Sequence, residues 1–235
     1  DLAAQRWIRK HAGLDPVIAD ALLEDDSRPR VLEHPDGMLV ILRGVNSNPG
    51  QSPEDMVSIR FWIEAGRVIS TRRRKLLSVK NLRDDLEKGL GPKDGADMLV
   101  KLVHRLSDRI EPVVDDIENA IEQAEDRFDR DALGSYRGEF SSLRRQAMRI
   151  RRFLAPQRTG IEQLSRVTSG LLSDAQRLDL REETNRMTLY LENLDLVRER
   201  AMVAQEELIA KLAQQQNERI YILSLVAAVF LPLSF

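Results

Sequence analysis

The sequence predicts an α+β protein in which an N-terminal α/β/α domain with a mostly antiparallel sheet is followed by a long helical hairpin and a very long stalk helix leading into a membrane. Three observations carry this prediction. Short extended runs separated by turn signals fill roughly the first ninety residues. After Asp94 the sequence is helical in character, and its last sixteen residues, 220–235, carry no charge.

Two short helices are expected within residues 3–25. Asp15-Pro16 opens the second, because aspartate is a favoured N-cap and proline is tolerated in the first helical turn. Four β-type runs follow: Arg30–Glu33, Met38–Val45, Val57–Ile63 and Val68–Thr71. Turn signals lie between them at Asp36-Gly37 and Ala65-Gly66-Arg67, and a loop at Asn46–Pro53. An amphipathic helix at Leu76–Leu90, ended by Gly89, Gly91 and Pro92, completes this part.

Three long helices make up the rest of the prediction. The first two run from about 96 to 128 and from about 135 to 168, with a break at Gly134 that makes them a hairpin; the second is expected to bend at Pro156 and Gly160. Ser173-Asp174 caps a third helix that meets no breaker before Pro232, a length of roughly 85 Å at about 1.5 Å per residue. We therefore divide the chain into residues 1–92, 93–172 and 173–235.

The third helix carries an apolar stripe with a seven-residue repeat. Its members are Leu180, Met187, Leu194, Ala201 and Leu208, widened by Tyr190, Leu191, Val197, Ala204 and Leu212. A seam of this kind requires partner helices. The two preceding helices account for part of it, and we expect the far end of so long a helix to find partners in other copies or in a membrane.

Charge is segregated between the two arms of the hairpin. Residues 111–131 hold nine acids against two arginines, and residues 137–166 hold eight arginines against two glutamates. We expect the two arms to pair across the hairpin as solvated faces. Gathering of cations by the acidic arm is the alternative.

Composition excludes several classes of function. The net charge of −2 gives no nucleic-acid signature, and the absence of cysteine removes disulfides and thiolate metal sites. The three histidines are far apart, and there is no Walker loop, GxSxG or HExxH motif. Residues 126–134 (DRFDRDALG) do not have the spacing of a calcium loop. The sequence thus predicts a protein that is not an enzyme and has no cofactor.

The uncharged segment 220–235 (IYILSLVAAVFLPLSF) is shorter than the roughly 20 residues that cross a bilayer. A buried core helix is the alternative. We expect instead the first part of a membrane helix, truncated at about 220–235, and hence a chain that is part of a longer protein.

Two sets of motifs resemble the CorA-type divalent-cation transporters. The segment from Asn217-Glu218 to Phe235 resembles their first membrane helix, with Phe230-Leu231-Pro232-Leu233-Ser234 near its outer end. A second set resembles the ZntB-like zinc branch: Arg28-Pro29-Arg30, Leu42–Asn46 with Asn48-Pro49-Gly50, Asp55–Arg60, Arg72–Lys75 and Ala155–Arg158. These pieces occur in order over essentially the whole chain.

The resemblance implies a funnel-shaped homopentamer in the bacterial inner membrane, with this part on the cytoplasmic side and the third helix continuing into the pore. Its partners would be membrane lipid and divalent cations, and nucleic acid would not be one of them. The transported ion would be Zn²⁺, with Co²⁺, Ni²⁺ and Cd²⁺ as related cargo. A second membrane helix and a Gly-x-Asn loop would follow Phe235.

Two groups of residues are candidates for function. The resemblance places pore-lining positions at Asn217, Ile220, Leu223 and Leu231. It also implies metal sites between subunits, and the acidic residues nearest such a site are Asp179, Glu182 and Glu183, facing Asp84 or Asp85. Solvent-exposed helix charge is the alternative for the acidic group.

Two other functions compete with transport. A scaffold or sensor could use the apolar tail only as an anchor and have no transport activity. A cytosolic coiled coil would require that tail to fold back into the core.

Overall fold

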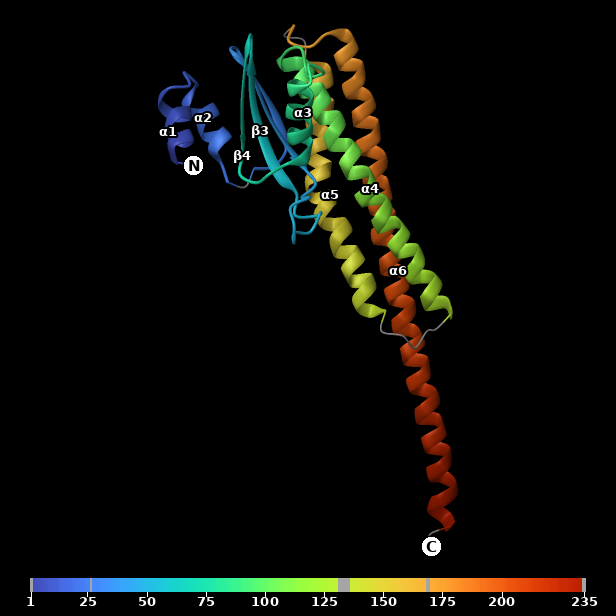
Figure 1. Ribbon diagram of the computed structural model, residues 1–235. Coiled ribbons are helices and arrows are strands. Elements are labelled where there is room, and N and C mark those ends of the chain that lie inside the picture. Colours follow the sequence, from blue (N-terminus) through green and yellow to red (C-terminus); the bar gives the residue numbers. More distant parts are fainter. Residues whose placement is uncertain (1, 26, 131–135, 168–169, 234–235) are drawn as a thin grey trace.

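Four strands form one antiparallel meander between two helical layers, and three long helices extend from it (Figure 1). The computed structural model describes residues 2–25, 27–130, 136–167 and 170–233. Its elements are α1 (Leu2–Lys10), α2 (Pro16–Leu23), β1 (Arg30–His34), β2 (Gly37–Gly44), β3 (Val57–Glu64), β4 (Arg67–Arg72), α3 (Leu77–Glu87), α4 (Gly95–Arg130), α5 (Arg137–Arg166) and α6 (Asp174–Leu233). The predicted fold class is confirmed.

Tight turns set the register of the sheet. The strand order is β1-β2-β3-β4, and His34 pairs with Gly37 at the first turn while Glu64 pairs with Arg67 at the last. Gly37 is required because a Cβ there would lie 2.4 Å from the carbonyl oxygen of Ile63. Gly66 adopts a φ of +82°, which glycine reaches without steric cost.

Alternating side chains give the sheet two buried faces. Leu39, Ile41 and Trp62 lie in a small core with α1 and α2. Met38, Val40 and Leu42 point the other way, into a large core shared with α3 and the long helices. The predicted α/β/α layering follows from this alternation.

Local hydrogen bonds and backbone conformation mark the ends of several helices. Asp15 caps α2 by accepting a hydrogen bond from the backbone of Val17 at 2.8 Å. Ser173 and Gln176 cap α6 reciprocally: the Gln176 amide donates to Ser173 Oγ at 3.3 Å, and the Ser173 amide donates to Gln176 Oε1 at 2.9 Å. A left-handed Gly89, with φ +75°, follows the end of α3.

The predicted hairpin lies in α4 and α5. Its break at Gly134, the helix start at Ser135 and the end at Thr168 lie outside the described residues. α5 continues as one helix through Pro156 and Gly160, and the bend expected there stays a prediction. The predicted segment boundaries at 92/93 and 172/173 fall in the connections before α4 and α6, and one apolar core continues across both.

The heptad stripe of α6 is buried within the chain. Leu180, Met187, Leu194 and Ala201 are fully buried, and Leu208 is 3% exposed. This seam packs into the same core as α4 and α5. The two preceding helices therefore account for the stripe over residues 180–208. Leu212 is 46% exposed, and the partners expected for the far end of the helix stay a prediction.

Charged residues of the two hairpin arms, 111–131 and 137–166, form ion pairs with α6. The ion pairs are Glu111–Arg186 and Glu125–Arg200 from α4, and Arg151–Asp195 from α5. Between the arms, the ion pair found in the described part of the chain joins Arg127 to Glu139, the minority charges of each arm. The charges of the two arms thus pair with α6 as well as with each other, because α6 lies against both arms.

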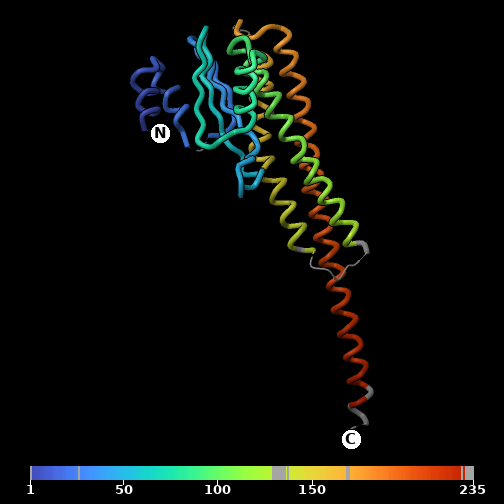
Figure 2. Tube along the Cα trace, in the orientation of Figure 1, coloured from blue at the N-terminus to red at the C-terminus, as the bar shows by residue number. Residues whose placement is uncertain are grey.

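Lys211 Nζ still lies 4.1 Å from the centre of the Phe128 ring of α4, and the C-terminal part of α6 then extends away from the bundle alone (Figure 2). Every side chain described from Gln216 onward is exposed. Within the residues described, no helix is both long enough and apolar enough to cross a bilayer. The membrane segment expected at about 220–235 stays a prediction.

Packing of the bundle can be tested on α5. Leu154 is fully buried and Met148 is 50% exposed. We expect Leu154→Ala to lower the free energy of unfolding by about 3 kcal/mol, since it removes buried methyl groups and leaves a cavity. Met148→Ala, the matched control, should cost less than about 1 kcal/mol. Denaturant unfolding followed by circular dichroism measures both, and equal losses would contradict the assigned burial.

Candidate functional site

A cavity of about 800 Å³ lies where α3, α4 and the start of α6 meet. Four of the five predicted metal-binding residues line it: Asp85, Asp179, Glu182 and Glu183. Asp84 is not among the lining residues. The remaining lining residues are Leu90, Asp97, Val100, Lys101, His104, Arg105, Asp108 and Arg186. The structure thus brings residues 85–108 and residues 179–186 into one charged site.

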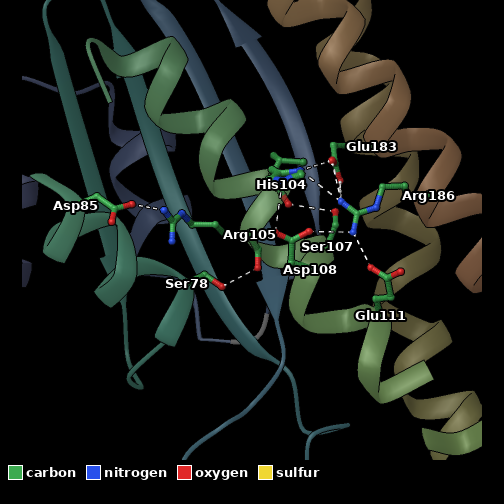
Figure 3. A network of polar contacts seen from close by, with 10 residues as sticks. Ser78, Asp85, His104, Arg105, Ser107, Asp108, Glu111, Glu183 and Arg186 are labelled. Carbon is green, nitrogen blue, oxygen red and sulfur yellow. Dashed lines mark hydrogen bonds and ion pairs between the residues drawn. The ribbon is translucent and has the colours of Figure 1, made fainter. Parts of the chain in front are cut away.

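Helical spacing explains how these side chains meet. His104 and Asp108 are four residues apart on α4, so they lie one above the other on one face. Glu183 and Arg186, three apart on α6, do the same. The two faces oppose each other, and Figure 3 shows the polar network that joins them.

Arg186 is the centre of this network. Its guanidinium lies 3.1 Å from Glu183 on its own helix and 3.0 Å and 2.9 Å from Asp108 and Glu111 on α4. Burial alone would lower the pKa of Arg186, but the hydrogen bond to Asp108 and the charge of Glu183 raise it above its ordinary value. Arg186 therefore stays charged and fixes α6 to α4.

His104 bridges two of the same carboxylates. Its Nδ1 lies 2.8 Å from Oε1 of Glu183, and its Nε2 lies 3.5 Å from Oδ2 of Asp108. The Glu183 side chain is only 6% exposed, whereas that of His104 is 59% exposed. A buried carboxylate thus has two cationic or polar partners, which offset the cost of its burial.

The rim toward α3 is also paired. Arg105 of α4 forms an ion pair with Asp85 of α3. Asp97 accepts a hydrogen bond from the Lys93 amide at 2.8 Å and pairs with Lys101 at 3.0 Å. Burial alone would raise the pKa of Asp97, but these partners outweigh it and lower that pKa.

Asp179 and Glu182 differ from the other acids of the cavity. Both are exposed, and neither makes an ion pair or a hydrogen bond to the described part of the chain. Among the described residues, however, no three histidine or acidic side chains are grouped so that they could hold a metal ion. One chain therefore supplies charge but no complete ligand set, and the metal site expected between subunits stays a prediction.

Sequence reasoning missed the centre of the site. His104, Asp108 and Arg186 were not predicted, although the four-residue spacing of His104 and Asp108 was a usable signal. Their convergence with Glu183 depends on how α4 packs on α6.

The predicted pore residues lie on the solitary part of α6. Asn217 is exposed, and Ile220 and Leu223 are 61% and 67% exposed. Their three-residue spacing keeps them near one face of the helix. Leu231 belongs to α6, but its side chain lies outside the described residues.

The role of Arg186 can be tested against a neighbour. We expect Arg186→Met to lower the free energy of unfolding by about 2–3 kcal/mol, because it leaves the buried Glu183 carboxylate without its main countercharge. Arg181→Met is the matched control: Arg181 is exposed on the same helix. Chemical denaturation at neutral pH compares the two variants. A loss for Arg186→Met no larger than that for Arg181→Met would contradict the network.

Comparison with known proteins gives consistent results. The sequence profile described as "CorA-like Mg2+ transporter protein" matches residues 1–235. A "Divalent cation transporter CmaX" of Pseudomonas aeruginosa is 40% identical over 234 residues, 99% of this chain and 70% of that protein. A "Zinc transport protein ZntB" of Pectobacterium carotovorum is 34% identical over 233 residues, 99% of this chain and 71% of that protein.

A solved structure agrees with these sequence matches. The structure of the full-length CmaX protein superposes with a TM-score of 0.95 at 39% identity, covering 100% of this chain and 72% of that one. The likeness therefore extends over the sheet, the hairpin and the whole of α6.

Proposed function

This chain belongs to the family of CorA-like Mg²⁺ transporter proteins, and we propose that it forms the cytoplasmic funnel and the start of the pore in a homopentameric Zn²⁺ transporter. Zinc is the cargo named for the ZntB relative, and a divalent cation is named for CmaX. Family membership supports ion transport and gives no support for an enzyme. The inner membrane is the proposed location.

One observation carries the proposal: the end of α6 is apolar and has no cover within the described chain. Beyond Ile220 the exposed fractions include 69% for Tyr221, 58% for Ile222 and 67% for Leu223. Burying each such side chain is worth about 1.5–3 kcal/mol. A surface of this kind favours lipid and neighbouring helices over water.

A second apolar stripe on α6 supports self-association. Leu189, Leu196 and Val203 repeat every seven residues and are 54%, 52% and 58% exposed. Each follows a residue of the buried seam by two positions, so the stripe lies on nearly the opposite face of the helix. A second copy of α6 could pack here without disturbing the bundle. The number five rests on the family resemblance.

The proposed gate consists of rings of the same residue around the pore axis. In a pentamer each of Asn217, Ile220, Leu223 and Leu231 occurs five times. An Asn ring can hold a hydrated ion through its water, whereas narrow rings of Ile and Leu dewet and block ions. Packing of these side chains against another membrane helix is the alternative.

Assembly can be tested on the exposed stripe. We expect the full-length protein in detergent to scatter light as a pentamer. Leu196→Glu should reduce this mass, because five charges would enter the interface. Met148→Glu changes a similarly exposed residue on α5 and should leave the pentamer intact. A wild-type protein that forms a stable dimer or monomer would contradict the proposal.

The gate can be tested with Leu223→Asp. At a pore ring this change should wet the constriction and raise the Zn²⁺ leak into proteoliposomes, measured with a trapped fluorescent indicator. Leu225→Asp is the matched control: Leu225 is 55% exposed and lies two residues on, on the opposite face. There, a charge should lower assembly without raising the leak of assembled protein.

Two outcomes would contradict this function. A well-folded Leu223→Asp pentamer that leaks no more than wild type would remove the gate assignment. A full-length wild-type protein that assembles but carries no Zn²⁺ would favour the anchored scaffold.

A further inference from the structure

Four of the five motifs of the second set meet at a cavity that the transport proposal does not use. The cavity holds about 480 Å³ and lies beside the sheet, between the loop before β3, the first residues of β3 and the residues that follow β4. Its lining residues are Asp25, Arg43, Gln51, Asp55, Met56, Val57, Ser58, Arg60, Arg73, Arg74 and Phe153. Segments 42–46, 55–60 and 72–75 all contribute side chains, and segment 155–158 supports one of them through Gln157.

Two arginines of this cavity are held in place by the fold. Arg43 is 7% exposed and Arg60 is 2% exposed. The Arg43 guanidinium donates to the carbonyls of Ser27 at 3.1 Å and Met56 at 3.0 Å, and it lies 3.9 Å from the centre of the Phe153 ring. Its backbone amide donates to Gln157 of α5 at 2.6 Å. This guanidinium is thus oriented before any ligand arrives.

The acids of the cavity already have cationic partners. Asp25 forms an ion pair with Arg73, and Asp55 lies 3.7 Å from Arg149 of α5. Arg74 is exposed and makes no ion pair or hydrogen bond to the described residues. The cavity wall therefore has four guanidinium groups against two carboxylates, and one of these groups is available to a ligand.

A second cavity adjoins the first. It holds about 660 Å³ and shares Arg60 and Arg73 with it. Its other walls include Trp7, Leu22 and Ile69, and Trp7 is 46% exposed. An anionic ligand bound in the first cavity could therefore extend into the second, along its aromatic and apolar wall.

Guanidinium groups recognise phosphate oxygens by paired hydrogen bonds, and Arg is better suited to this than Lys. A run of basic residues is usually just a solvated surface. Here the run 72–75 borders a concave site with two buried, oriented arginines, which favours a ligand over bulk water. We propose that this arginine cavity binds the phosphate of a phosphorylated small molecule.

Calorimetry on the chain in detergent tests the proposal, in metal-free buffer at near-physiological salt. Inorganic pyrophosphate and a nucleoside triphosphate are the probes. We expect Arg74→Glu to weaken binding roughly tenfold or more, because it replaces a charged donor with a like charge. Arg145→Glu, on the exposed side of α5, makes the same charge change outside the cavity and should alter affinity less than about twofold.

The two probes identify the source of the phosphate. Equal affinity for both would assign the site to inorganic phosphates. Tighter binding of the nucleotide that is lost in Trp7→Ala would place its organic part in the adjoining cavity. Arg74 is exposed, so folding should survive its change, and Arg74→Gln provides a second variant. No binding by the wild type, or equal weakening by Arg145→Glu, would overturn the proposal.

Discussion

The burial of the apolar seam of α6 by α4 and α5 constrains the rest of this structure. α6 has 60 residues, and its seam from Leu180 to Leu208 is buried against the hairpin. Beyond Leu208, Lys211 still lies over the Phe128 ring of α4, and every side chain described from Gln216 onward is exposed. Arg186 and Arg200 fix the covered half electrostatically to α4. The sheet packs against the hairpin, and the arginine cavity lies beside Phe153 of α5.

Local pattern predicted most of the fold, because local chemistry determines it. Turn glycines and period-two alternation located all four strands, and Asp15 and Ser173 marked helix starts that the structure confirms. The length of α6 followed from the absence of breakers. The heptad repeat, in contrast, indicates that a helix has partners but not which ones, so it could not show how much of the stripe the two preceding helices would cover.

The charged site was only partly predictable. Acidic residues on α6 and Asp85 on α3 were found, and they do line one cavity. Their partners could not be found, because His104 meets Glu183 only through the packing of α4 on α6. The charge segregation of the hairpin was incomplete for the same reason: the opposite net charges of the two arms do not reveal that α6 also forms ion pairs with both. The arginine cavity, too, exists only after distant segments are brought together.

The two apolar stripes of α6 have a mechanical consequence. Leu194 faces the bundle and Leu196 faces outward, about 200° apart around the axis. Rotation of α6 about its own axis would expose the buried seam to water. Exposure of its five apolar side chains would cost roughly 10 kcal/mol. Tilting or sliding the entire bundle costs none of this. The packing thus opposes rotation of α6 about its own axis, and motion at one end of the bundle is transmitted to the other as rigid-body displacement.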